Sequence, residues 1–87
     1  MFDLNNKVVL LTGASGGIGK SIALNMKKSG AKLILSGTRK NVLEDIALEL
    51  GSDTKSIITD LSSKESILNL AKEAENIFGR IDVLINN

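Results

Sequence analysis

The sequence contains no cysteine, histidine, tyrosine or tryptophan among its 87 residues. Without cysteine, neither a disulfide framework nor a thiolate zinc site is possible. Most side chains that transfer protons or act as nucleophiles near neutral pH are also missing, which leaves Lys, Asp, Glu, Ser and Thr. Any catalysis by these 87 residues would depend on that small set.

Strong charge and long apolar runs are absent as well. The net charge is +1, which gives no reason to expect nucleic acid as a partner. No apolar run approaches the length of a membrane span, and the first seven residues do not resemble a signal peptide. We therefore expect one globular unit at most, with no membrane partner, in the reducing cytoplasm.

Four short apolar runs, over residues 7–11, 31–36, 56–59 and 81–85, indicate strands. The first run has no polar interruption after Lys7, as expected for a strand buried on both faces of a parallel sheet. Residues 52–55 are expected to form a loop before the third strand.

Three amphipathic stretches separate these runs, each with apolar residues three or four positions apart. Gly30, Gly51 and Gly79 follow the stretches and are typical of helix ends. The spacing of Ser62 and Glu65 predicts a capping box at the start of the third helix. The expected apolar faces are formed by Ile18, Ile22 and Met26, by Leu43, Ile46, Ala47 and Leu50, and by Ile67, Ala71, Ala74 and Phe78.

This alternation predicts an α/β fold, a partial Rossmann-type doubly wound parallel sheet with the element order β-α-β-α-β-α-β, truncated after its fourth strand. In the strand order 3-2-1-4, ligands bind beyond the carboxyl ends of the strands, where the sheet order reverses. The residues expected at that edge are the glycine-rich turn 12–19, residues 37–39, Asp60 and Asn87.

The turn over residues 12–19 joins the first strand to the first helix and contains four glycines. The first N–H groups of a helix have no intrahelical partner and carry partial positive charge, so they can hold a phosphate. Glycines let the phosphate approach the backbone and permit positive φ angles. The turn therefore predicts a phosphate-binding site.

Two kinds of phosphate site are compatible with this turn. A relaxed P-loop would run from Ala14 to Ser21, with Lys20 on the terminal phosphates and Ser21 and Asp60 holding magnesium. A dinucleotide site would instead use Gly13, Gly17 and Gly19, and would leave Lys20 as a solvated helix residue.

The dinucleotide pattern is not the common G-x-G-x-x-G fingerprint. The sequence Thr-Gly-Ala-Ser-Gly-Gly-Ile-Gly resembles the Thr-Gly-x-x-x-Gly-Ile-Gly motif of the short-chain dehydrogenase/reductase family. Asp60-Leu61 is similar to that family's Asp-aliphatic pair, whose carboxylate reaches the adenine amino group. Asn86-Asn87 resembles the start of its Asn-Asn-Ala-Gly motif, which supports the cofactor. Together with the turn after the second strand, described next, these make four matches in family order and favour this interpretation over the P-loop.

The end of the second strand bears on which cofactor is bound. An acid there takes the ribose hydroxyls of NAD, but this chain has Gly37 followed by Thr38 and Arg39. A guanidinium and a hydroxyl suit the extra phosphate of NADP(H). Taken with the resemblance, the expected cofactor-binding residues are Gly13, Ala14, Ser15, Gly16, Gly17, Ile18, Gly19, Thr38, Arg39, Asp60, Leu61 and Asn87.

Within the family, the chain looks most like the 3-oxoacyl-[acyl-carrier-protein] reductases of fatty acid synthesis, although these often carry Arg where Gly16 stands. The resemblance implies hydride transfer from NADPH to a carbonyl by homo-oligomeric enzymes, with acyl-carrier-protein-bound substrates. It also implies a catalytic Ser, Tyr and Lys after the Asn-Asn-Ala-Gly motif, inside which this sequence ends. We therefore expect residues 1–87 to be the amino-terminal part of an NAD(P)-binding Rossmann domain without a complete active site. The alternative is a dinucleotide-binding module that catalyses nothing.

Overall fold

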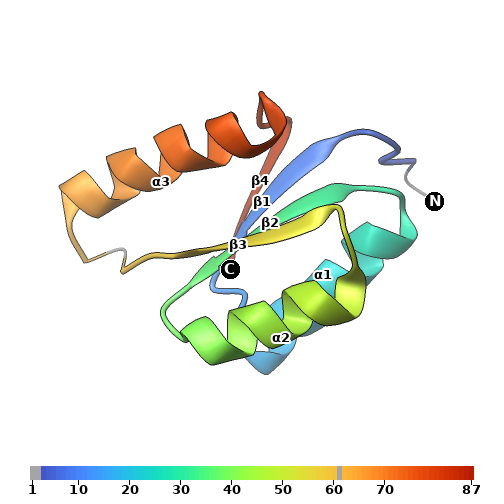
Figure 1. The fold of residues 1–87 in the computed structure, drawn as a ribbon, viewed down its shortest axis with the longest axis horizontal. Helices are drawn as coiled ribbons and strands as arrows, with labels where there is room; N and C mark the ends of the chain where they lie inside the picture. Colours follow the sequence, from blue (N-terminus) through green and yellow to red (C-terminus); the bar gives the residue numbers. More distant parts are fainter. Residues whose placement is uncertain (1–2, 61) are drawn as a thin grey trace.

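A computed structural model describes residues 3–60 and 62–87, which form a single sheet flanked by three helices (Figure 1). Strands and helices alternate along the chain, as the sequence predicts. The elements are β1 (Val8–Thr12), α1 (Gly17–Lys28), β2 (Lys32–Gly37), α2 (Lys40–Leu50), β3 (Thr54–Ile58), α3 (Lys64–Phe78) and β4 (Val83–Asn86).

The four strands are parallel and lie in the order β3-β2-β1-β4, so the predicted order 3-2-1-4 is confirmed. Val9 pairs with Leu33 on one side of β1 and with Val83 on the other. The order reverses between β1 and β4, which places the expected ligand edge beyond Thr12 and Asn86.

Two apolar layers separate the sheet from its helices. Helices α1 and α2 cover one face, over side chains such as Val9, Leu11 and Leu33. Helix α3 covers the opposite face, where Leu10 and Ile34 pack against it (Figure 1). Successive residues of β1 alternate between these layers, and all five residues of the strand are buried.

The predicted start of the third helix is wrong by one residue. Ser63, not Ser62, is the N-cap of α3, because its Oγ accepts a hydrogen bond of 3.1 Å from the Ser66 N–H. The Ser62 N–H instead donates to the Asp60 carboxylate at 3.0 Å in the preceding turn. The capping box expected from Ser62 and Glu65 is therefore not formed.

The buried face of α3 differs only in part from the expected one, since Ala74 and Phe78 belong to the apolar layer as predicted. Leu70 and Ala74 are buried, whereas Ile67 is 49% exposed and Ala71 is exposed. Ile67 and Ala71 face toward Leu84 of β4 across an open apolar groove. Since β4 is the outermost strand of the described sheet, no further element among the described residues packs on these side chains.

The third strand begins earlier than the sequence predicts. Thr54 already pairs with Leu33, so β3 starts inside the stretch 52–55 that was expected to be a loop. Its first three residues are polar, and only Thr54 and Ile57 are buried, because β3 lies at the edge of the sheet. An edge strand needs only partial burial, so the beginning of β3 carries no apolar run that would indicate a strand.

Candidate cofactor site

The glycine-rich turn lies between β1 and α1, and its outer glycines are required by close packing. Gly13 has a φ of +64°, and a Cβ there would lie 2.5 Å from the backbone oxygen of Asn87. A Cβ on Gly19 would lie 2.5 Å from the Gly13 oxygen and 2.7 Å from the Ala14 Cα. Any larger residue at either position would push the turn apart.

Close packing against the described residues does not require the two inner glycines of the turn, Gly16 and Gly17. A Cβ on Gly17 would have nothing within 4 Å, and one on Gly16 would meet only the Gly13 oxygen at 4.0 Å. Gly16 has an extended backbone with a φ of −88°, which any residue can adopt. Since the fold itself does not demand these two glycines, the space beside the first turn of α1 is left open.

The three helices all begin at the carboxyl edge of the sheet, yet only α3 of the described helices is capped by a side chain. Gly16 and Arg39, the N-cap residues of α1 and α2, make no capping hydrogen bond through a side chain. The first turns of α1 and α2 contain no acid, whereas α3 has Glu65. The positive ends of α1 and α2 are thus left for an external anion.

The end of β4 supports the glycine turn from the side. Thr12 Oγ1 donates to the Asn86 amide oxygen at 2.8 Å and accepts from the Asn87 N–H at 3.3 Å. Asn87 also donates through Nδ2 to the Gly13 carbonyl at 3.0 Å. In Figure 1 the carboxyl end of the chain accordingly lies beside the loop between β1 and α1. Asn87 therefore holds the position of Gly13.

The remaining residues of the turn have different surroundings. Ala14 is buried and donates its N–H to the Ser36 carbonyl at 2.9 Å, so this N–H is not available to a ligand. Ser15 lies beside Gly37, where a Cβ would come within 3.0 Å of the Ser15 Oγ. Ile18, expected on the apolar face of the first helix, is 73% exposed at the open side of the turn.

The loops after β2 and β3 complete this edge. Thr38 and Arg39 are both exposed, and none of the ion pairs among the described residues involves Arg39. Asp60 is also exposed, and its carboxylate accepts the Ser62 N–H. Asp60 follows β3, which β2 separates from β1, so the loop of Asp60 is farther from the turn along the sheet. Leu61, expected to contact the cofactor, lies outside the described residues.

A cavity of about 290 Å³ lies between α1 and α2, next to the open glycines. One wall is formed by Ser15, Gly16, Gly17 and Lys20, and the other includes Glu49 of α2. Lys20 Nζ lies 3.2 Å from Glu49 Oε2, so Lys20 is ion-paired and not simply solvated as expected. Sequence reasoning missed this cavity because no local pattern relates Lys20 to a residue on another helix.

Residues 7–87 match the family described as short chain dehydrogenase. The chain belongs to the short-chain dehydrogenase family. The P-loop interpretation of the turn is therefore wrong.

Relatives within the short-chain dehydrogenase family are longer than this chain. An uncharacterised oxidoreductase of Staphylococcus aureus (strain USA300) is 39% identical over 85 residues, which are 97% of this chain and 37% of the relative. An uncharacterised oxidoreductase of Staphylococcus saprophyticus is 44% identical over 88 residues, covering 100% of this chain and 36% of the relative. The chain thus spans somewhat more than a third of the curated relatives that it matches.

A solved structure has the same fold over this region. The crystal structure of 3-ketoacyl-(acyl-carrier-protein) reductase from Brucella melitensis, complexed with NADH, is similar with a TM-score of 0.87 and 31% sequence identity. The match covers 92% of this chain and 33% of that chain. Family membership and this neighbour support a nicotinamide dinucleotide as the cofactor.

The described residues contain neither a metal-binding cluster nor a membrane-spanning helix. Within residues 3–60 and 62–87, no group of three or more Asp, Glu, His or Cys side chains is arranged to hold a metal ion. None of the helices in the same ranges combines the length and apolarity needed to cross a membrane.

Proposed function

We propose that residues 1–87 are the amino-terminal, cofactor-binding part of an NADPH-dependent short-chain reductase. The observation that carries this proposal is the open space beside Gly17, at a helix start with neither a capping side chain nor an acid. A glycine that the fold does not need, at the positive end of a helix, suits close approach of a phosphate to the backbone.

Some residues of the turn would maintain its shape, and others would contact the cofactor. Gly13 and Gly19 hold the turn in shape, while the backbone N–H groups near Gly16 and Gly17 would face the diphosphate. Asn87 keeps Gly13 in place through its side-chain hydrogen bond. When bound, the nicotinamide cofactor supplies the hydride that reduces a carbonyl.

Preference for NADPH over NADH rests on the end of β2. Gly37 stands where an acid would bind the ribose hydroxyls of NADH, and that acid would repel a 2′-phosphate. Arg39 is exposed at the uncapped start of α2. A guanidinium beside a helix N-terminus attracts a phosphate by charge and by a forked set of hydrogen bonds.

We further propose that the substrate is a 3-oxoacyl thioester carried by acyl carrier protein. This proposal is supported by the 3-ketoacyl-(acyl-carrier-protein) reductase from Brucella melitensis as a structural neighbour. The Ser, Tyr and Lys that the family uses for proton transfer would belong to the part of the relatives beyond the matched third. Residues 1–87 alone would then bind cofactor without reducing substrate.

Cofactor binding is tested by Gly17→Asp in the intact protein that carries this chain, with calorimetric titration of NADPH. A carboxylate at the first turn of α1 fills the open space, occupies the positive end of the helix and repels a phosphate, so affinity should fall by roughly tenfold or more. The matched control is Ser66→Asp, which adds the same charge to the first turn of α3. Unchanged NADPH affinity in Gly17→Asp would contradict the site.

NADPH preference is tested by Arg39→Met in the same titration, with NADH alongside. Loss of one charge-assisted contact should weaken NADPH by about tenfold and leave NADH unchanged. Lys28→Met, at the opposite end of α1, removes the same charge away from the site. Equal affinity of the unmodified protein for both cofactors would rule out the role of Arg39.

A further inference from the structure

Lys20 lies one helical turn after Gly16, and its backbone N–H donates to the Gly16 carbonyl at 3.0 Å. Residues four apart share a helix face, and helical side chains lean toward the N-terminus. Lys20 and Gly16 accordingly line the same wall of the 290 Å³ cavity. The Lys20 side chain therefore belongs to the surroundings of the open turn.

The opposite wall of this cavity is acidic. Asp45 and Glu49 of α2 line it, and Glu49 is held by Lys20 at 3.2 Å. Without Lys20, both carboxylates would oppose a phosphate that enters the cavity between α1 and α2. Lys20 thus decides whether this end of the cavity accepts or repels a phosphate.

The ion pair is placed so that Lys20 can change partners. The Lys20 and Glu49 side chains are 46% and 56% exposed, so Glu49 can be left in water at little cost. Pairs with this exposure contribute little to folding, and the four rotatable bonds of lysine allow its ammonium to move. The pair keeps a positive charge beside the turn without burying it.

We propose that Lys20 is a specificity-determining residue that exchanges Glu49 for the 2′-phosphate of NADP(H), acting together with Arg39. This inference rests on the proposed function, since it requires the dinucleotide to bind along the glycine turn. It adds a residue that neither the glycine motif nor the end of β2 contains. It also gives Glu49 a role, which is to compete with the phosphate for Lys20.

The test uses two nucleotides that differ only in the 2′-phosphate, adenosine 2′,5′-bisphosphate and adenosine 5′-phosphate. Both are titrated calorimetrically into the intact protein and its variants. Lys20→Met should weaken the bisphosphate by about fivefold and leave the monophosphate unchanged, while Lys20→Arg should retain most of the preference. Glu49→Gln should strengthen the bisphosphate by about twofold, because Lys20 loses its competitor. The preference should also shrink as salt rises from about 50 to 500 mM.

The outcomes separate this inference from the proposed function. If Arg39→Met removes the preference for the bisphosphate and Lys20→Met does not, the role of Lys20 is overturned and the NADPH site stands. If Lys20→Met weakens both nucleotides equally, Lys20 acts on the shared 5′-phosphate or on the structure, and the inference is overturned. If the unmodified protein binds neither nucleotide, or binds both equally, the proposed NADPH site and the inference fail together.

Discussion

The polar groups at the amino ends of the strands and those at the carboxyl ends differ in their partners; we call these two ends the amino edge and the carboxyl edge. At the amino edge, Asp82 accepts the Val8 N–H at 2.8 Å and returns its own N–H to the Val8 carbonyl at 2.9 Å. Arg80 pairs with the Asp82 carboxylate at 2.9 Å and donates to the Asn6 carbonyl. At the carboxyl edge, α1 starts with no side-chain cap and with open space beside Gly17.

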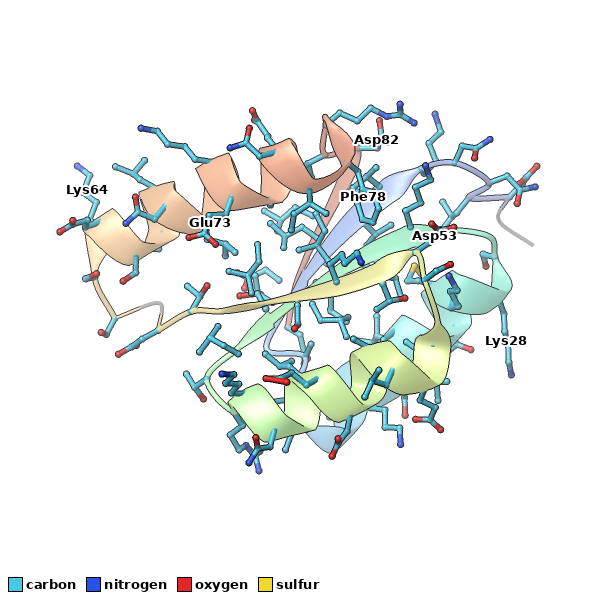
Figure 2. The ribbon with its side chains drawn as sticks, viewed as in Figure 1. Lys28, Asp53, Lys64, Glu73, Phe78 and Asp82 are labelled. Carbon is cyan, nitrogen blue, oxygen red and sulfur yellow. The ribbon has the colours of Figure 1, made fainter. Side chains whose placement is uncertain are left out.

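This difference indicates that the amino edge stabilises the fold, whereas the carboxyl edge is suited to binding a ligand. The amino edge satisfies its donors and charges within the chain, and so holds β4 in register with β1. Figure 2 shows Asp82 there, in the turn after α3. At the carboxyl edge, the backbone N–H groups at the start of α1 have no side-chain cap and can instead bind a ligand. Three substitutions test this division.

The largest effect is expected from Gly19→Ala. Its Cβ would meet the Gly13 oxygen and the Ala14 Cα, so the free energy of unfolding should fall by roughly 2–3 kcal/mol. Gly17→Ala is the matched control, since its Cβ meets nothing, and should change stability by less than about 1 kcal/mol. Urea unfolding measures both. Equal losses in the two variants would break the distinction between structural and ligand-facing glycines.

The second prediction concerns the amino edge and its pH dependence. The hydrogen bond from Val8, and then Arg80, lower the pKa of Asp82. A carboxyl whose pKa is lowered by folding stabilises the protein above its unfolded pKa, about 4, and loses that contribution as pH falls through the folded value. Asp82→Asn should therefore be less stable at pH 7, and its stability should depend less on pH between about 5 and 2.

The control for Asp82 is Asp53→Asn. The Asp53 carboxylate makes no hydrogen bond or ion pair with the described residues, and Figure 2 shows Asp53 in the loop before β3. Thermal unfolding across the pH range compares the two variants. An acid-unfolding profile for Asp82→Asn that matches the unmodified protein would show that the amino edge is held by other contacts.

The smallest effect is expected at α3, the described helix whose N-terminus is capped by a side chain. Ser63→Ala removes the cap on the Ser66 N–H and should lower the free energy of unfolding by about 1 kcal/mol. Ser62→Ala keeps the Ser63 cap and should lower the free energy of unfolding by clearly less. NADPH affinity should be unchanged in both variants, since α3 is not the helix that faces the turn. A larger loss of stability in Ser62→Ala than in Ser63→Ala would show that Ser62 caps the helix, as the sequence predicts.

The glycine turn of the candidate site could be predicted because its signals are local. Thr12, Gly13, Gly17 and Gly19 lie within eight consecutive residues, and the strand before them and the helix after them carry clear periodicity. The roles of the individual glycines could not be predicted in this way. Gly13 is restricted by Asn87, from the far end of the chain, and Gly17 is not restricted at all.

The errors at α3 have a different cause. Ser62 and Ser63 both precede the helix, and either satisfies a local capping rule, so only the bond to Ser66 distinguishes them. Several faces of α3 carry apolar residues, and the choice of Leu70 over Ile67 depends on which face meets the sheet. That contact is set by packing, which spacing along the helix does not specify.

By itself, the sequence determined the alternation of strands and helices, the parallel sheet order and the glycine turn, because each depends on neighbouring residues and on general rules of chain connection. Only the tertiary structure decided the bond between Val8 and Asp82, 74 residues apart, and the ion pair of Lys20 with Glu49. Contacts between distant segments leave no periodic signal in either segment. They form where the folded layers bring the two side chains together.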